Sequence, residues 1–251
     1  MKLNDLRIVV TGAAGGLGRQ FCRSLIADGA HVAAFDVDAQ GLHDLALGLP
    51  ADRLFTFVAD VSREAEVVHA VGSATAVLGS INALINNAGI YRDGLIARDL
   101  EGAVLKMPLA QWRSVLDVDL TGPFLVTREV AAQMIEKHVR PGIIVNISSI
   151  MRHGNAGQSC YSAAKAGVVS ASRLWADELA RYGIRVCSIA PGFVRTPILE
   201  ATDEAVLAGW IERTPLQRLG EPSEIYAGVR FAIECDFFNG RCLEIDGGLR
   251  V

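Results

Sequence analysis

Arg7-Ile-Val-Val-Thr11-Gly12-Ala-Ala-Gly15-Gly16-Leu17-Gly18 is the stretch of sequence that decides the fold. Its first five residues are typical of a short buried strand, and residues 16–28 have the apolar spacing of a helix. The glycines between them let the backbone turn tightly and approach a ligand without a Cβ in the way. The free N–H groups at the start of a helix suit a pyrophosphate. The stretch predicts a dinucleotide-binding turn at Gly12, Gly16 and Gly18, with an ordinary glycine-rich turn as the alternative.

Strand and helix patterns alternate along the rest of the chain. Short β-branched runs predict strands at residues 7–11, 31–36, 54–58, 83–86, 143–148, 185–190 and 241–245. Helical patterns separate them, among them 16–28, 64–78, 109–138 and 161–181. Strands that are apolar nearly throughout must be buried on both faces, which indicates a parallel sheet. We expect a single doubly wound, Rossmann-type α/β domain over residues 1–251, with about seven strands and helices on both faces.

Two connections are longer than the two to six residues that are usual in α/β proteins. They span about residues 90–107 and 191–210, and each follows the end of a predicted strand. Open α/β sheets bind their ligands at that edge. Both connections are therefore predicted to be substrate loops.

Composition excludes several classes of function. The chain has 251 residues, 51% of them hydrophobic, with a formal net charge of −4 and scattered basic residues, so a nucleic acid partner is not expected. No apolar run reaches the roughly 18 residues of a membrane span, and no signal peptide is apparent. The five cysteines are widely spaced and indicate neither a disulfide framework nor a metal site. A cytoplasmic protein is expected.

Asp36 ends the second predicted strand, about 20 residues beyond the glycines. A carboxylate there accepts hydrogen bonds from an adenosine ribose and repels a 2′-phosphate. Neither Arg nor Lys occurs at Ala13, Ala14, Val37 or Asp38 to offset that charge. The cofactor is therefore predicted to be NAD rather than NADP, with a helix N-cap as the alternative role of Asp36.

Tyr161 and Lys165 are four residues apart in a predicted helix, which places both side chains on one face. Tyrosine is a weak acid with a reference pKa of about 10, so a nearby cation is one way to make it exchange protons with an alcohol or carbonyl. Taken alone, the pair is weak support for catalysis, because such spacing also arises by chance.

Several motifs occur in a fixed order. The glycine stretch is followed by Asn86-Asn87-Ala88-Gly89, by Ser148-Ser149 and by Tyr161-Ser-Ala-Ala-Lys165. Further motifs are Asp60-Val61, Pro191-Gly192 with Thr196, and Asp246-Gly247-Gly248. With these motifs the chain resembles the short-chain dehydrogenase/reductase family over essentially its whole length.

The resemblance implies an NAD-dependent oxidoreductase that transfers a hydride between the nicotinamide and a secondary alcohol or ketone. Tyr161 would be the acid/base, Lys165 would assist it and bind the nicotinamide ribose, and a serine hydroxyl would bind the substrate oxygen. The resemblance also implies a homotetramer. The cofactor would contact Gly12, Gly15, Gly16, Leu17, Gly18, Asp36, Val37, Asp60, Val61, Asn87, Ala88, Gly89, Ile147, Tyr161, Lys165, Ile189, Pro191, Gly192, Val194 and Thr196.

The chain departs from the family pattern in two places. The usual spacing before the tyrosine selects Ser148, whereas the position in the strand selects Ser149. A loop loses a residue more easily than a buried strand shifts its register, so we expect Ser149 to be catalytic. Asp119 stands where the family typically has an Asn that serves a water chain from the lysine. Asp119 accepts but does not donate, so activity with an altered pH optimum is expected.

The substrate is less well defined. A hydrophobic body is favoured, while Arg152, His153 and Arg195 would suit a carboxylate or the phosphates of an acyl carrier, or are simply solvated. Because the segment 154–158 resembles that of 3-oxoacyl-thioester reductases, a 3-oxoacyl (ACP/CoA) reductase or 3-hydroxyacyl dehydrogenase is the alternative function. An NAD-using lyase or epimerase and a non-catalytic NAD-binding protein are weaker alternatives. The apolar candidates for the pocket are Tyr91, Met151, Phe193, Val194, Ile198, Leu199 and Trp210.

Overall fold

A seven-stranded parallel sheet forms the centre of the protein in the computed structural model, which describes residues 1–196, 199 and 203–249. The strand order is β3-β2-β1-β4-β7-β8-β9, and every pair of neighbours is parallel. This order confirms the predicted doubly wound α/β fold. The strands are β1 Arg7–Thr11, β2 His31–Asp36, β3 Leu54–Val58, β4 Ala83–Asn86, β7 Gly142–Ile147, β8 Ile184–Pro191 and β9 Cys242–Ile245.

The predicted strands agree with the observed ones to within one residue at each end. β1, β2, β4, β7 and β8 are almost wholly buried, as expected of strands covered on both faces. β3 differs because it is the edge strand, and its Val58 side chain is 63% exposed. Its apolar sequence alone does not distinguish an edge from a central position.

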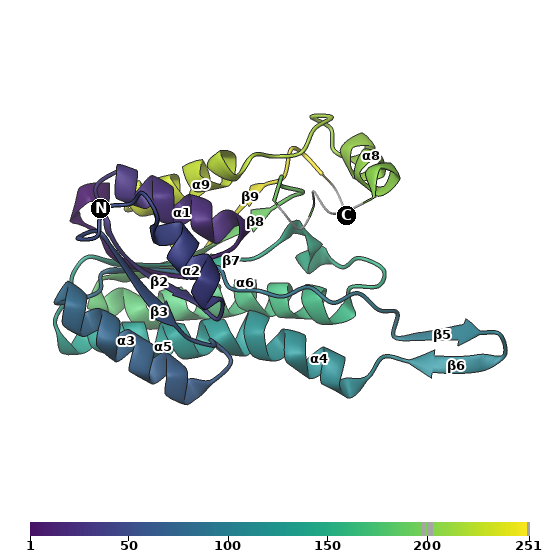
Figure 1. The fold of residues 1–251 in the computed structure, drawn as a ribbon, viewed down its shortest axis with the longest axis horizontal. Helices are drawn as coiled ribbons and strands as arrows, with labels where there is room; N and C mark the ends of the chain where they lie inside the picture. Colours follow the sequence, from purple (N-terminus) through teal and green to yellow (C-terminus); the bar gives the residue numbers. More distant parts are fainter. Residues whose placement is uncertain (197–198, 200–202, 250–251) are drawn as a thin grey trace.

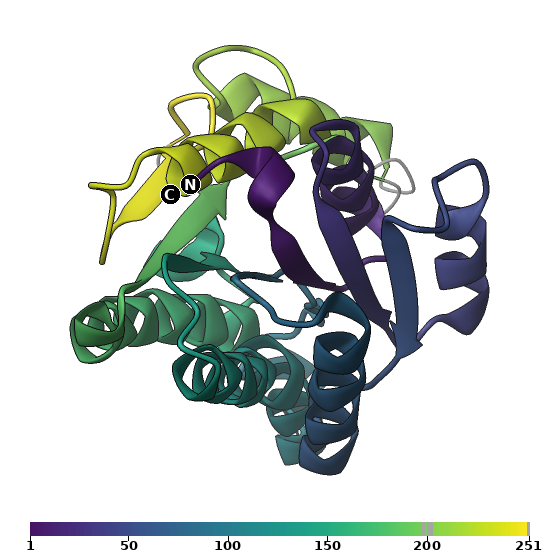
Figure 2. The same ribbon diagram turned by 90° about the vertical axis from the view of Figure 1, so that its left-hand side faces the viewer.

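Helices cover both faces of the sheet (Figures 1 and 2). One face packs against α1 Gly16–Ala27, α2 Ala39–Ala46 and α9 Pro222–Glu234. The other face packs against α3 Glu64–Leu78, α5 Gly122–Glu136 and α6 Ser159–Leu179. Among the described residues there are further helices, α4 Leu109–Leu116, α8 Glu204–Arg213 and the short η1 Leu3–Asp5, η2 Asp117–Thr121, η3 Ile150–His153 and η4 Ala180–Tyr182. Each face of the sheet thus has its own apolar cluster of side chains.

The helix predicted over residues 109–138 is interrupted. A π-helical turn, η2, separates α4 from α5 and contains Asp119. A π turn inserts one extra residue into the helix and is frequent at functional sites. The predicted range is therefore helical over nearly its full length, but the prediction of one continuous α-helix is wrong.

Two of the helices that pack on the sheet, α2 and α9, are not among the helical stretches named from the sequence. At the start of α2 the Asp38 carboxylate accepts the N–H of Gly41 at 3.0 Å. At the start of α9, Glu224 accepts the N–H of Glu221 at 2.8 Å, and Pro222 occupies the first turn. Both are ordinary start signals for a helix, so the sequence did contain the information.

The two predicted loops contain regular structure. The first includes an antiparallel hairpin, β5 Ala97–Leu100 and β6 Ala103–Lys106, which projects from the body beyond α4 (Figure 1). The second includes the start of α8, while residues 197, 198 and 200–202, and with them the pocket candidate Ile198, lie outside the described residues. In the part of the chain that is described, no helix is both long and apolar enough to cross a membrane.

Candidate functional site

The glycine turn brings three backbone segments into contact at the carboxyl end of β1. A Cβ on Gly18 would lie 2.0 Å from the carbonyl oxygen of Gly12. Gly12 has a φ of 64°, and a Cβ there would lie 2.7 Å from the Cα of Ala88. A Cβ on Gly15, by contrast, would have no heavy atom within 4 Å. Gly12 and Gly18 are therefore required by close packing, whereas Gly15 faces open space where a ligand can approach.

Thr11, which the sequence analysis assigned no role, ties β1 to β4. Its hydroxyl accepts the N–H groups of Asn87 and Ala88, both at 3.0 Å. The Asn87 amide in turn donates to the carbonyls of Thr11 and Gly12, both at 3.1 Å. These bonds hold the ends of two neighbouring strands together, so the predicted contacts Asn87 and Ala88 lie beside the glycine turn.

Asp36 lies at the carboxyl end of β2, as predicted. Its two carboxylate oxygens accept the N–H of Ala14 at 2.9 Å and the N–H of Asp38 at 3.0 Å. The guanidinium of Arg19 donates to the carbonyl of Ala14 and to that of Gly41. The carboxylate is thus oriented by backbone, and Val37 beside it is exposed.

Asp60 and Val61 follow β3 at the same edge of the sheet. Burial raises the pKa of Asp60, but hydrogen bonds from Ser62 and the charge of Arg63 outweigh it, so the pKa is lowered. Val61 packs against Gly122, where an added Cβ would lie 2.8 Å from the Val61 methyl. Asp60 is therefore held in its charged form.

The segment after β8 closes the other side of this edge. An added Cβ on Gly192 would lie 2.7 Å from the Cα of Asp246, and the Gly192 N–H donates to the carbonyl of Ile245 at 2.9 Å. An added Cβ on Gly16 would lie 3.3 Å from the methyl of Thr196, so Thr196 reaches the glycine turn. Predicted cofactor contacts from both ends of the chain thus converge.

Lys165 is the buried cation of the site. Its Nζ lies 3.2 Å from Oδ2 of Asp119, donates to the carbonyl of Ile147 at 3.2 Å and lies 5.5 Å from the centre of the Tyr161 ring. Burial lowers the pKa of Lys165, but the charge of Asp119, with a smaller effect of Tyr161, outweighs it, so the pKa is raised. Lys165 is therefore protonated beside the Tyr161 ring, as the predicted pair requires.

Asp119 is fully buried in the π turn. Its Oδ1 accepts the N–H of Ile90 at 2.7 Å, while its Oδ2 faces Lys165 at the 3.2 Å ion-pair distance. A Cβ on Gly89 would lie 3.0 Å from Oδ2 of Asp119. Both neighbours of the carboxylate are donors, so an acceptor without an N–H of its own fits this position.

The two serines after β7 have different partners. The Ser148 hydroxyl donates to the carbonyl of Lys165 at 2.8 Å in the buried interior. The Ser149 hydroxyl instead accepts the N–H of Met151 at 3.1 Å. Since a hydroxyl has one proton to donate, Ser149 keeps its donor for a ligand and Ser148 does not.

Aromatic and apolar side chains surround Tyr161. The ring of Tyr91 packs edge-on against it at 5.5 Å, and the Gln158 amide donates to the Tyr91 hydroxyl. Met151 and Phe193 belong to the same apolar cluster as Tyr161. The structure adds Leu249 to this cluster and stacks Phe193 on Trp210 at 4.6 Å. The sequence does not predict these two contacts, because Gln158 is distant in the sequence from Tyr91, and Leu249 is distant from Met151.

Two of the basic residues near this edge are already paired. Arg152 forms an ion pair with Glu244, and Arg195 lies 3.1 Å from Glu221. Each of these charges is therefore balanced by a carboxylate of the same chain, and a role of either arginine in binding an anionic substrate stays one of the two predicted alternatives.

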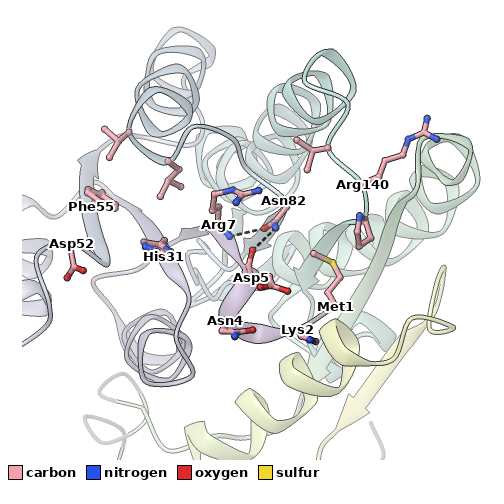
Figure 3. Close-up of a pocket in the computed structure, with 14 residues that line it drawn as sticks. Met1, Lys2, Asn4, Asp5, Arg7, His31, Asp52, Phe55, Asn82 and Arg140 are labelled. Atoms are coloured by element: carbon pink, nitrogen blue, oxygen red, sulfur yellow. Dashed lines mark hydrogen bonds between the residues drawn. The ribbon is translucent and has the colours of Figure 1, made fainter.

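A separate cavity of about 680 Å³ lies at the opposite edge of the sheet (Figure 3). Arg7, His31 and Asn82, at or next to the amino ends of their strands, line it with the N-terminal residues. Its described lining includes none of the predicted site residues. All seven strands of the central sheet are parallel, so their carboxyl ends, and the predicted site, lie at the other edge.

The glycine turn, the carboxylate of Asp36, the partly buried Tyr161 and the buried Lys165 and Asp119 lie at one edge of a doubly wound sheet. This combination is typical of a class of proteins: oxidoreductases that use a nicotinamide dinucleotide.

Comparison with known proteins places the chain within that class. The family model described as short chain dehydrogenase matches residues 7–206, and the chain belongs to this family. The 3-oxoacyl-[acyl-carrier-protein] reductase FabG of Thermotoga maritima is 37% identical over 255 residues, covering 99% of both chains. The acetoacetyl-CoA reductase of an Acinetobacter species is 35% identical, covering 96% of both.

A solved structure is similar over the same length. The 3-ketoacyl-(acyl-carrier-protein) reductase of Brucella melitensis, complexed with NADH, superposes with a TM-score of 0.88 at 27% identity. The match covers 99% of this chain and 100% of that one. The chain is an oxidoreductase with a nicotinamide cofactor, and these similarities favour the 3-oxoacyl reductase alternative over a general alcohol dehydrogenase.

Proposed function

We propose that this protein uses NADH to reduce a 3-oxoacyl thioester, carried on coenzyme A or on an acyl carrier protein, to the 3-hydroxyacyl thioester. The observation that carries the proposal is similarity along almost the full length to reductases named for such substrates. The buried Lys165 and Asp119 next to Tyr161 support the same chemistry. A 3-hydroxyacyl dehydrogenase is the same reaction run in the oxidative direction.

The residues present fit a dinucleotide. Gly15 leaves open space beside the start of α1, where free N–H groups suit a pyrophosphate. Asp36, Asp60 and Val61 would hold the adenosine part, with Asn87, Ala88 and Gly89 along its ribose. Ile147, Ile189, Pro191, Gly192, Val194 and Thr196 would surround the nicotinamide, which supplies the hydride.

The protein's own residues would supply the proton and bind the reacting oxygen. Tyr161 would give its phenolic proton to the oxygen of the 3-oxo group. Ser149 would donate its free hydroxyl hydrogen to the same oxygen and stabilise the charge that develops there. Lys165, protonated beside the ring, favours the phenolate that remains.

NAD rather than NADP belongs to this proposal because of Asp36. Its charge lies where a 2′-phosphate would be placed, at the end of β2. The Arg19 guanidinium is engaged by two backbone carbonyls, which leaves it poorly placed to offset that repulsion.

A ketone with a hydrophobic body is the second candidate substrate. The apolar cluster of Met151, Phe193 and Leu249 beside Tyr161 favours it. A thioester has its own apolar acyl chain, so the cluster is compatible with both substrates.

The test is a substrate panel followed at the nicotinamide absorbance band. Acetoacetyl-CoA is compared with simple ketones of similar size, each with NADH and with NADPH. We expect the highest kcat/KM for acetoacetyl-CoA with NADH, and loss of turnover in Tyr161→Phe. A simple ketone with an equal or higher kcat/KM would favour the second candidate, and NADH binding without turnover of any substrate would contradict both.

A homotetramer and a cytoplasmic location complete the proposal. All five cysteines are free, which suits a reducing compartment. Sedimentation of the purified protein and fractionation of cells that express it test these two points.

A further inference from the structure

The hairpin β5–β6 (residues 97–106) has two chemically different faces. In the antiparallel register Arg98 pairs with Leu105 and Leu100 with Ala103. Side chains directly opposite each other lie on the same face, and successive residues alternate between faces. One face therefore presents Leu100, Ala103 and Leu105, with Ile96 at its base, and only Arg98 is charged there. The other face presents Ala97, Asp99, Val104 and Lys106, two of them charged.

Every residue of the two strands is nevertheless exposed. Ile96 is 75% exposed, Leu100 50% and Leu105 42%. The hairpin points away from the sheet and its covering helices (Figure 1). A two-stranded hairpin is marginally stable by itself, and an apolar face alternating with a polar one is typical of strands that are covered on one side. The apolar face thus has the residue pattern of a buried surface, although no described segment of its own chain covers it.

The base of the hairpin, in contrast, is anchored. The N–H of Gly94 donates to the carbonyl of Gly157 at 2.8 Å, and the Gln111 amide donates to the carbonyl of Asp93 at 3.0 Å. Above this base, Met107 donates its N–H to the carbonyl of Ile96 at 3.0 Å. The turn at Glu101 and Gly102 has positive φ at both residues, as tight hairpin turns require. These hydrogen bonds and the tight turn therefore fix where the hairpin starts and the direction in which it projects.

We propose that the apolar face of the hairpin packs against a second copy of this chain. Charge favours this partner, because Arg98 and Lys106 balance Asp99 and Glu101 within residues 97–106. A strongly acidic protein or a nucleic acid would need an excess of positive charge. A copy of the same chain needs none.

The free edge of β6 supports the same partner. Charge and proline usually keep an edge strand from pairing, but three of the four residues of β6, Ala103, Val104 and Leu105, have neither, and the one charge, Lys106, lies at its end. Two β6 edges related by a two-fold axis at Val104 would place Ala103 opposite Leu105 in both directions. That pairing keeps both apolar faces on one side and opposes no like charges.

The hairpin alone is too small for a stable interface, which needs about 800 Å² from each partner. Further apolar side chains are exposed on the helices that follow it, Leu109 on α4 and Phe124 on α5. The hairpin therefore acts as an arm that extends a larger contact between subunits. This inference goes beyond the proposed reaction and does not depend on it.

The test compares the two faces. Sedimentation velocity over a range of concentrations is measured for the wild type, for Leu100→Ser/Leu105→Ser and for the matched polar-face control Asp99→Ser/Lys106→Ser. We expect the apolar-face variant to dissociate at a concentration at least about tenfold higher than the wild type, and the control to assemble normally. Circular dichroism and NADH binding verify that each variant is folded.

A second measurement does not rely on those variants. Val104→Cys is labelled with a benzophenone maleimide, irradiated and run on a denaturing gel beside labelled wild type, since Cys235 and Cys242 are partly exposed. We expect a band at twice the chain mass that the wild type lacks. An apolar-face variant with unchanged assembly, or an adduct that stays at monomer mass, overturns the proposal. Unchanged assembly with weaker use of carrier-linked substrates alone would show that the hairpin instead binds a carrier protein.

Discussion

Lys165 Nζ lies 3.2 Å from Asp119 Oδ2, and both side chains are at least nine-tenths buried. Burying two charges costs several kcal/mol for each ion, and pairing offsets much of that cost. The ion pair has no net charge, so the negative charge of Asp119 weakens the electrostatic effect of the Lys165 ammonium on Tyr161. Asp119 therefore sets how strongly Lys165 stabilises a phenolate.

Asp119→Asn is expected to retain activity with a changed pH profile. The carboxylate raises the pKa of Lys165, so its removal lowers that pKa. Removal of the same negative charge favours the Tyr161 phenolate, and the reduction needs Tyr161 protonated, so the basic limb of kcat/KM against pH moves to lower pH. Asp117→Asn, in the same π turn, is the control. Superimposable profiles for wild type and Asp119→Asn would show that the carboxylate has no electrostatic role.

The two serines are expected to respond differently to alanine. Ser149→Ala removes the free donor, so kcat/KM should fall at least about 100-fold with little change in stability. Ser148→Ala leaves the Lys165 carbonyl without its partner, so the free energy of unfolding should fall by about 1–3 kcal/mol while most activity remains. Chemical denaturation and steady-state kinetics of both variants check this. A larger loss of kcat/KM in Ser148→Ala would reverse the assignment.

Gly18→Ala should destabilise the protein by at least about 3 kcal/mol, because the new Cβ would lie 2.0 Å from a backbone oxygen that cannot move freely. Gly15→Ala is the matched control, since its Cβ meets nothing within 4 Å. We expect it to preserve stability while it weakens NADH binding, which separates packing from cofactor contact. Thermal denaturation and NADH titration measure the two effects, and equal melting curves for both variants would refute the packing argument.

Asp36→Asn should shift cofactor choice toward NADPH. The amide oxygen still accepts one of the two N–H bonds, from Ala14 or Asp38, while the charge is removed. The ratio of kcat/KM for NADPH to that for NADH should rise by about tenfold or more, equal to about 1.4 kcal/mol. Asp52→Asn, at the opposite edge of the sheet, controls for the lost charge. An unchanged ratio would mean that Asp36 serves only to orient the turn.

Buried parallel strands are easy to predict, because burial on both faces demands a nearly continuous apolar run. That is why the strand predictions agree with the structure to within a residue. The sequence predicts a loop where the hairpin lies, because the alternation of side chains is only four residues long in each strand. The π turn has no signature in composition, since it is one extra residue in an otherwise helical pattern.

The side chains proposed to take part in the reaction could also be predicted, because their order and spacing can be read from the sequence. The hydrogen-bond partners of these side chains could not be predicted. Asp119 is held by the N–H of Ile90, and Lys165 by the carbonyl of Ile147. Backbone groups are the same in every residue, so which of them reaches a side chain depends on the fold and not on the sequence nearby.

The hydrogen bonds at the base of the hairpin separate the hairpin from the candidate active site, so the sequence of one can vary without changing the structure of the other. The chain leaves the site at Gly94, whose N–H donates to the carbonyl of Gly157, and it returns at α4, where the Gln111 amide donates to the carbonyl of Asp93. Insertions, deletions or exchanges between those points need not displace Tyr91 or Asp119. Evolution or protein engineering can therefore change the residues of the hairpin, and with them its binding partner, without changing the residues that carry out the reaction.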